Sequence, residues 1–263
     1  MPFPTAPRVL YRSNPLEEVI CQLRFPTILR IDSEAPAAFQ EKLRLEYPFY
    51  ESKGAARVPL SMPPEVEQLL ASGISFGGQK AHEFTSRDQN WTINLTRDYI
   101  AITCRKYERW EYFRDRLQFG VEALREVYAP SFYTRLGLRY RDIIRRSTVG
   151  VNVKTPWTEL LQPWIIGPLS SADIVADVEA VQTSSVILIP EVNGAVRIQH
   201  GLAIVEASKE QVFLIDADFF IDQQTETDDA FAKLSALNLQ GRLFFRWCIT
   251  DDLHEAMEPT ELP

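Results

Sequence analysis

The clearest alternation of hydrophobic and polar positions along this chain lies in residues 131–146. Read with a period of two, the stretch carries apolar side chains on one side and a basic row on the other, which is typical of a long strand with one buried face. The apolar side comprises Phe132, Leu136, Leu138, Tyr140 and Ile144, and the other side comprises Tyr133, Arg135, Gly137, Arg139, Arg141 and Arg145. We therefore expect the apolar side to pack in a core and the basic side to meet negative charge.

Seven further stretches have the composition of strands. Residues 16–25, 74–84, 91–96 and 99–105 precede the basic stretch, and residues 175–189, 195–207 and 211–222 follow it. Turn-forming pairs such as Arg97-Asp98 and Asn193-Gly194 separate neighbouring stretches. Because strands joined by short turns pair antiparallel, each half of the chain is predicted to form an antiparallel meander.

A period of three to four residues predicts three helices, at residues 35–47, 110–128 and 229–248. The apolar stripe of the first long helix comprises Trp110, Phe113, Leu117, Val121, Leu124 and Tyr128. The stripe of the last helix comprises Phe231, Leu234, Gly241, Phe245 and Cys248. A meander followed by a long helix thus occurs twice, and the first of these helices is expected to lie across the first meander.

Between residues 146 and 172 the hydrophobic periodicity is interrupted by Pro156, Pro163, Gly167 and Pro168. Only a short helix at 157–161 is expected there. This stretch is the best candidate for a boundary. We predict an α+β fold of two antiparallel meander-plus-helix layers packed side by side, residues 1–150 and 151–263, with the basic strand near their junction. A single continuous domain is the alternative.

The composition indicates a globular protein, because 45% of the 263 residues are hydrophobic, enough for a substantial core. The net charge of −8 opposes general binding to nucleic acid. The three cysteines are far apart in apolar surroundings and are expected to be reduced thiols. Since no stretch has the length of a membrane helix and the first residues lack a signal peptide, we expect no membrane contact and a cytoplasmic location.

Three segments resemble a sporadically distributed bacterial protein family of unknown function. They are Asn14-Pro15-Leu16-x-Glu18-Val19 running to Leu23-Arg24-Phe25-Pro26, the central Arg135-x-Gly137-Leu138-Arg139-Tyr140, and the closing Phe245-x-Trp247-x-Ile249-Thr250. The family usually carries Asn where this chain has Asp142. The resemblance implies no established activity, and the patchy distribution of the family implies an accessory role such as phage defence.

Catalytic and metal chemistry find little support in the sequence. Gly73-Ile74-Ser75-Phe76-Gly77 matches the G-x-S-x-G pattern of hydrolases, but a strand follows it in place of the required helix. Neither a phosphate loop nor a dinucleotide fingerprint occurs, so no ATP, dinucleotide or other cofactor is expected. The histidines are isolated, and we expect no metal site. The remaining enzymatic alternative is a metal-dependent hydrolase or nuclease that uses Asp216 and Asp218.

The basic row decides between two interpretations. From Arg135 to Arg145 it would span about 33 Å, at ~3.3 Å per residue, which suits an extended acidic or phosphate-bearing partner. Cross-strand pairs with Asp216, Asp218 or Glu17 would explain it equally well. Our preferred hypothesis is a non-enzymatic binding or adaptor module that recognises a protein or an anionic ligand. Its expected contact residues are Arg135, Arg139, Tyr133 and Arg141, with Arg139 facing a groove and Arg141 nearer the plain surface; the sequence predicts no oligomeric state.

Overall fold

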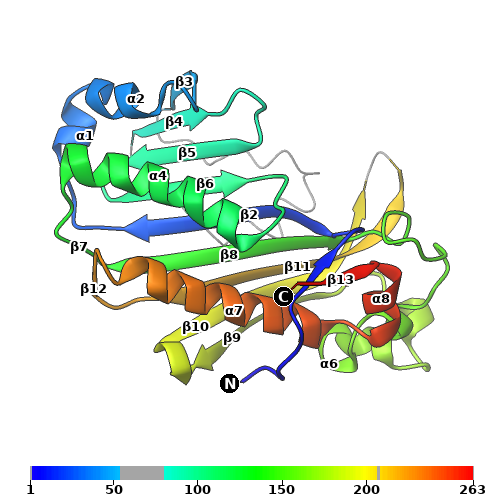
Figure 1. Ribbon diagram of the computed structural model, residues 1–263. Helices are drawn as coiled ribbons and strands as arrows, with labels where there is room; N and C mark the ends of the chain where they lie inside the picture. Colours follow the sequence, from blue (N-terminus) through cyan, green and yellow to red (C-terminus); the bar gives the residue numbers. More distant parts are fainter. Residues whose placement is uncertain (1, 54–79, 206–207, 263) are drawn as a thin grey trace.

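The computed structural model describes residues 2–53, 80–205 and 208–262, and within them the dominant feature is a nine-stranded antiparallel sheet (Figure 1). Across the sheet the order is β3-β4-β5-β6-β2-β8-β11-β10-β9. The strands are β2 (Leu16–Arg24), β3 (Phe49–Lys53), β4 (Ala81–Thr85), β5 (Trp91–Thr96), β6 (Tyr99–Cys104), β8 (Arg135–Ile144), β9 (Gln182–Ile189), β10 (Gly194–Val205) and β11 (Glu210–Ile221). The α+β prediction with antiparallel pairing is confirmed.

Two long helices, α4 (Trp110–Tyr128) and α7 (Ala230–Cys248), lie across the same face of this sheet (Figure 1). The stripe predicted for α4 is the buried one, because Phe113, Leu117 and Leu124 are each at most 1% exposed. Burying such side chains contributes roughly 1.5–3 kcal/mol each, which fixes the rotation of the helix on the sheet. Ala129 caps α4 in the left-handed conformation, and Pro130 follows it.

The remaining helices in the described chain are short. They are α1 (Arg30–Ser33), α2 (Ala37–Leu43), α5 (Trp157–Leu160), α6 (Pro163–Ile166) and α8 (Asp251–Ala256), with 3-10 turns η1 (Gly167–Ser170), η2 (Val175–Asp177) and η3 (Pro190–Val192). Thr250 caps α8 by accepting a hydrogen bond from the Leu253 amide, as a Thr before a helix is expected to do. The predicted early helix is shorter than expected, because it ends at Leu43, four residues before Tyr47.

In the described chain, two small two-stranded sheets accompany the large one, and the first joins the N-terminal and C-terminal segments. β1 (Val9–Tyr11) pairs with β13 (Pro259–Glu261), and β7 (Phe132–Tyr133) pairs with β12 (Thr225–Glu226). Phe3 is buried against Phe244 and Trp247 of α7, so the N-terminal segment is fastened to that helix. This fastening matters below, because β1 forms one wall of a cleft.

The predicted second meander exists, but its first strand begins seven residues later than expected. Residues 175–177 form a 3-10 turn, and the strand starts at Gln182. The predicted division after residue 150 falls within one sheet, because β8 of the first half pairs with β11 of the second from Leu136 to Ile144. The Gly73–Gly77 motif and most of the 74–84 strand lie outside the described residues.

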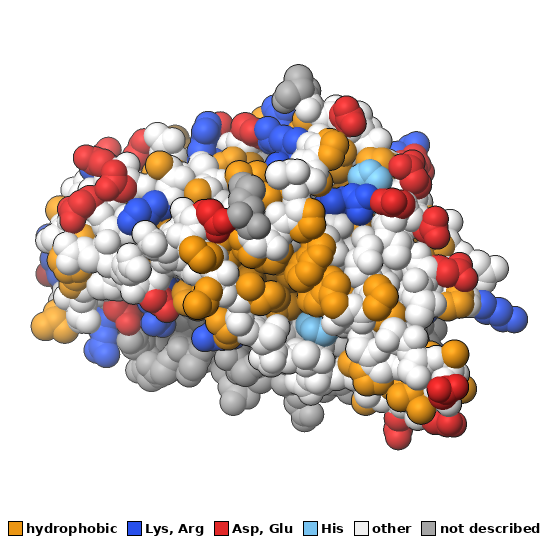
Figure 2. Space-filling view, turned by 90° about the horizontal axis from the view of Figure 1, so that it is seen from below, with side chains coloured by type: hydrophobic (Ala, Val, Ile, Leu, Met, Phe, Trp, Pro, Cys, Tyr) orange, Lys and Arg blue, Asp and Glu red, His pale blue; other side chains and the backbone are white. Residues whose placement is uncertain are grey.

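The surface seen from below has hydrophobic side chains gathered near its centre and charged ones toward its rim (Figure 2). Among the described helices none is both long and apolar enough to cross a bilayer. All three cysteines, Cys21, Cys104 and Cys248, are buried and free, as expected for core thiols.

Candidate functional site: a cleft beside a charged strand

Strand β8 lies between β2 and β11, and the side chains on its two faces have different surroundings. Leu136 and Leu138 are fully buried on the face covered by the helices. The arginines point to the opposite face, as the alternation predicted. Because β8 is an interior strand, each arginine has neighbouring strands on both sides, and those neighbours decide whether its charge is available to a partner.

Arg139 is enclosed by an aspartate. Its Nε donates to Oδ1 and its Nη2 to Oδ2 of Asp216 on β11, each at 2.6 Å, and the residue is only 7% exposed. Burial alone lowers the pKa of Arg139, but the adjacent Asp216 charge and its hydrogen bonds raise it above the ordinary value. A bidentate pair of this kind neutralises the guanidinium inside the protein.

Arg141 and Arg135 complete an ion-pair network across three strands. Arg141 donates to Glu18 of β2 at 2.7 Å and lies 3.5 Å from Asp216. Arg135 donates to Asp218 at 2.8 Å, and a Cβ atom at Gly137 would come within 2.3 Å of its Nη1 atom. The missing side chain at Gly137 therefore makes room for an internal guanidinium, where we expected a partner to approach.

Three expectations about the basic row are wrong. Arg139 does not face an open groove, because Asp216 occupies its hydrogen-bonding edge. Arg141 is not a plain surface residue, because it is 2% exposed between two carboxylates. Tyr133 is fully buried and pairs with Thr225 of β12, since the strand breaks at Thr134 and leaves Tyr133 in a separate short ladder. Arg135 keeps a partly open side chain, 18% exposed, and Arg145, which pairs with Glu17, is 26% exposed.

The same contacts weigh against a metal site at Asp216 and Asp218. Both carboxylates accept hydrogen bonds from arginines, whose positive charge opposes a divalent cation at the same atoms. Burial, partly offset by Arg135 and Arg139, raises the pKa of Asp218, which also disfavours metal binding. Across residues 2–53, 80–205 and 208–262, no cluster of three or more His, Cys, Asp or Glu side chains is arranged to hold a metal ion.

A different part of the molecule carries unsatisfied polar groups: a cleft on the helix side of the sheet, which we call the helix-side cleft. Its walls come from β1, the start of β2, the loop before α4, strands β8 and β11, and the C-terminal half of α7, and its volume is about 130 Å³. Its aromatic walls include Tyr11, Tyr107, Trp110, Tyr140, Phe219, Phe244 and Phe245, and its ionisable side chains are Arg8, Glu108, Arg109, Asp142, Arg242 and Arg246. Apolar clefts with a few convergent polar groups are the usual form of ligand sites.

Gly241 brings α7 close to the sheet at this cleft. A Cβ atom there would lie 2.6 Å from the Tyr140 ring, closer than packed side chains allow. One turn earlier, Asn238 donates its side-chain amide to the Tyr140 hydroxyl at 2.7 Å. Together these contacts fix the Tyr140 ring as a rigid wall.

Asp142 lies two positions after Tyr140 and therefore points to the same helix-covered face. It is 6% exposed and lines the helix-side cleft, yet no described residue donates a hydrogen bond to its carboxyl group. Burial, and secondarily the nearby charge of Asp216, raise the pKa of Asp142 to about 8. At neutral pH the group is thus mainly a neutral acid, able both to donate and to accept a hydrogen bond.

Two arginines of the cleft lack carboxylate partners among the described residues. Arg242 donates to the backbone oxygens of Ala6 at 2.8 Å and Pro7 at 2.9 Å, and burial lowers its pKa. Arg109 stacks on the Tyr112 ring at 4.0 Å, and its Nε is buried without a hydrogen-bond partner.

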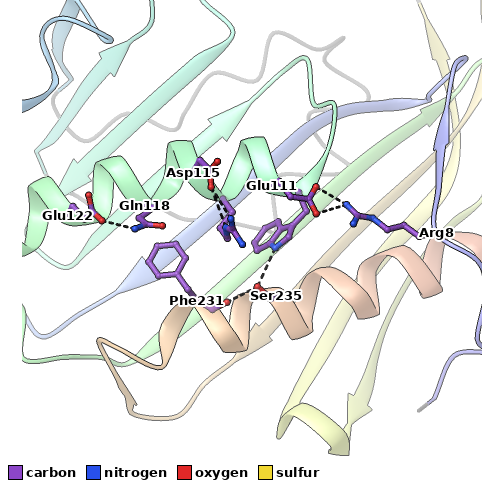
Figure 3. Close-up of polar contacts among 9 residues, drawn as sticks. Arg8, Glu111, Asp115, Gln118, Glu122, Phe231 and Ser235 are labelled. Atoms are coloured by element: carbon purple, nitrogen blue, oxygen red, sulfur yellow. Dashed lines mark hydrogen bonds and ion pairs between the residues drawn. The ribbon is translucent and has the colours of Figure 1, made fainter. Parts of the chain in front are cut away.

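The other two cleft arginines are paired. Arg8 donates to both oxygens of Glu111 at 2.7 Å, a contact that links the segment before β1 to α4 (Figure 3). Arg246 pairs with Asp251. The Trp110 indole also donates to Ser235 of α7 at 3.3 Å, which joins the two long helices beside the cleft (Figure 3). The free positive charge therefore belongs to Arg109 and Arg242.

Sequence reasoning missed this site, although one signal for it was present. Asp142 shares its alternating positions in the strand with the apolar residues Leu138, Tyr140 and Ile144. A lone carboxylate among the apolar positions of a strand is costly to bury, so such a residue is a candidate for a functional role. Arg109 and Arg242 carried no such signal, because surface arginines beside helices are common.

Comparison of the chain with models of known protein families gave no match, and comparison with curated proteins gave none. The resemblance to a sporadically distributed bacterial family therefore stays a prediction, and the function must be argued from the geometry of the helix-side cleft.

Proposed function

We propose that this protein is a binding module that holds a small anionic ligand in the helix-side cleft. The observation that carries the proposal is the pair of arginines, Arg109 and Arg242, that line an apolar cleft without a carboxylate partner among the described residues. A partly desolvated cation is stabilised strongly by an anion that accepts its free N–H groups. This keeps the anionic ligand that we expected from the sequence and moves its location from the basic row to the cleft.

Binding is favoured over catalysis by the protonation behaviour of the nearby side chains. Enzymes lower the pKa of a nucleophile, whereas burial raises the pKa of Tyr11 to about 12 even though its hydroxyl lies 2.8 Å from His254 Nδ1. Burial likewise raises the pKa of the Cys248 thiol well above its ordinary value. Neither group is prepared for covalent chemistry.

The proposal is tested by calorimetry on the full chain with ring-bearing anions and their neutral counterparts. Benzoate and phenyl phosphate serve as anionic probes, and benzamide and phenol as neutral ones. We expect the anions to bind at least tenfold more tightly, with an affinity that falls as salt is added.

Two variants locate the anion. Arg242→Gln and Arg109→Gln should each weaken anion binding by about 10- to 100-fold, since a hydrogen bond to a charged group contributes roughly 1.5–3 kcal/mol. Arg114→Gln is the matched control, because Arg114 lies on α4, pairs with Asp115 and does not line the cleft. Equal affinity for anionic and neutral probes, or equal losses in all three variants, would refute the proposal.

A further inference from the structure

Resting on the proposed function, we infer that the ligand of the helix-side cleft is a nucleoside monophosphate. Its base occupies the apolar end against Asp142, and its phosphate meets Arg109 and Arg242. Three features of the described residues lead to this assignment. They are the size of the cleft, the hydrogen-bond donor and acceptor that Asp142 offers, and the deeper burial of Asp142 relative to the two arginines.

The cleft fits one ring system. Its volume of about 130 Å³ is close to the ~150 Å³ of a protein cavity that holds benzene. Two of its walls are the rings of Tyr107 and Tyr140, which lie 6.3 Å apart and at 88° to each other. Planar bases stack on such rings at roughly 1–3 kcal/mol per base. Because the cleft opens to the surface, the sugar and phosphate extend outward from the ring.

Asp142 supplies the recognition of a base edge. A protonated carboxyl group offers one donor and one acceptor side by side, which matches the adjacent acceptor and donor of a lactam or amidine edge such as that of uracil, guanine, cytosine or adenine. Within the described chain this carboxyl has no hydrogen bond of its own. A simple aryl anion leaves that pair of hydrogen bonds unmade, whereas a base forms both.

Asp142 is kept protonated by its surroundings as a whole. The ionisable groups around it are Tyr11 from β1, Tyr140 on its own strand, Asp216 from β11, and Cys248 and Arg246 from α7. The tyrosines and the thiol are neutral at pH 7, because burial raises the pKa of each. Arg246 is held by Asp251, and Asp216 adds negative charge, so no free cation stabilises an Asp142 carboxylate.

The arginines stand nearer the surface than the carboxyl group. Asp142 is buried, whereas Arg109 and Arg242 are partly exposed. A ligand that spans from one to the others therefore carries a hydrogen-bonding edge at its inner end and an anionic group at its outer end. The arginine side chains take the role that a glycine-rich loop has in other nucleotide sites, so the absence of such a loop from the sequence does not oppose a monophosphate.

The test is calorimetry of the full chain at pH 7 with UMP, CMP, AMP and GMP against ribose 5-phosphate, inorganic phosphate and phenyl phosphate. We expect at least one nucleotide to bind tenfold or more tightly than ribose 5-phosphate. Its affinity should fall at least tenfold between pH 7 and pH 9.5, because ionised Asp142 loses its donor and repels the anion.

Two variants make the test specific to Asp142. Asp142→Asn keeps one donor and one acceptor at every pH, so it should remove the pH dependence. Asp142→Leu should lose the preference among bases while its affinity for phenyl phosphate is kept. Should Asp142→Leu fail to fold, the pH series of the wild type and of Asp142→Asn still decides the question.

The possible results separate the two proposals. If phenyl phosphate binds but no nucleotide exceeds ribose 5-phosphate, the nucleotide assignment is wrong and the anion-binding function stands. If no anion binds, both are wrong. A nucleotide affinity that is the same at pH 7 and pH 9.5 in the wild type would remove Asp142 from the recognition and overturn the assignment of the base to it.

Discussion

Asp142 shows how the surroundings of one residue set its chemistry. Arg139 and Asp142 are three residues apart on the same strand and face opposite sides of the sheet. Arg139 meets Asp216 and keeps its charge, whereas Asp142 meets aromatic walls and holds its proton. A buried charge without a partner costs far more than the neutral form of the same group. The strand therefore carries a structural ion pair on one face and a recognition group on the other.

The first prediction at this scale concerns stability against pH. The pKa of Asp142 is about 8 in the folded protein, against 3.8 in an unfolded chain. Between these values the folded state holds a proton that the unfolded state releases, so the free energy of unfolding falls as the pH rises from about 4 to 8. Asp142→Asn removes this contribution. We expect the variant to gain stability relative to the wild type between pH 5 and pH 8, by on the order of a few kcal/mol.

Urea unfolding at pH 5, 6.5 and 8 measures that gain. Asp115→Asn is the control, because Asp115 is an exposed carboxylate on α4 that pairs with Arg114. Its difference from the wild type should stay constant across the series. Parallel stability curves for the wild type and Asp142→Asn would show that Asp142 ionises normally in the folded protein.

The face on which each arginine of β8 lies could be predicted from the sequence, but its partner could not. The side of β8 on which each arginine lies follows from a period of two, and for residues 135–145 that assignment is right. Whether the charges are paired depends on Asp216, which is 77 positions further along the chain than Arg139. Local alternation contains no information about which strand becomes the neighbour. The open groove was inferred from one strand alone, and the neighbouring strand filled it.

At the scale of elements, α7 depends on one close contact with the sheet. Alanine at Gly241 gains roughly 1 kcal/mol of helix propensity, but its Cβ atom would lie 2.6 Å and 3.0 Å from two atoms of the Tyr140 ring. Overpacking of this kind costs ~1–3 kcal/mol. Because Asn238 holds the Tyr140 hydroxyl, the ring cannot move aside easily. We predict that Gly241→Ala lowers the free energy of unfolding and narrows the helix-side cleft.

Chemical denaturation with Gly120→Ala as the matched control checks this prediction. Gly120 is also a mid-helix glycine, on α4, but the nearest atoms to its Cβ would be the flexible ends of Ile93, at 3.1 Å, and Ile100, at 3.8 Å. Gly120→Ala should therefore be less destabilising than Gly241→Ala. A raised melting temperature for Gly241→Ala would contradict the close contact of α7 with the sheet.

The elements themselves were predictable to different degrees for physical reasons. Helix α4 matches its predicted bounds, because a long amphipathic period ends at a left-handed residue followed by proline. The start of β9 was placed seven residues early, because the alternation of residues 175–181 resembles a strand, whereas residues 175–177 form a 3-10 turn and the strand begins at Gln182. The break at Thr134 was missed, because alternation continues through a kink that only strand pairing reveals.

At the scale of the whole molecule, the two predicted meanders meet edge to edge in one sheet. The junction is the β8–β11 ladder, and the network of Arg139, Arg141 and Asp216 lies across it. Sequence reasoning predicted both meanders and placed the basic strand near their junction. It did not predict their direct pairing, because partners about 80 residues apart leave no local pattern and must form against the entropy of a long loop.

The last prediction is that the two halves unfold together, with Asp216 as a shared support. Asp216→Asn removes the charge that balances Arg139 and part of Arg141, and breaking a buried pair costs ~3–5 kcal/mol. Because Asp216 touches β8 directly and β8 pairs with β2, the loss should reach both halves of the sheet. Hydrogen exchange read by mass spectrometry should show equal losses of protection in β5 and β6 and in β10.

Asp222→Asn is the control, because Asp222 is 60% exposed and also pairs with an arginine of β8. Loss of protection confined to β9, β10 and β11 would instead show that the halves are separate folding units, since a single cooperative sheet cannot lose stability on one side only.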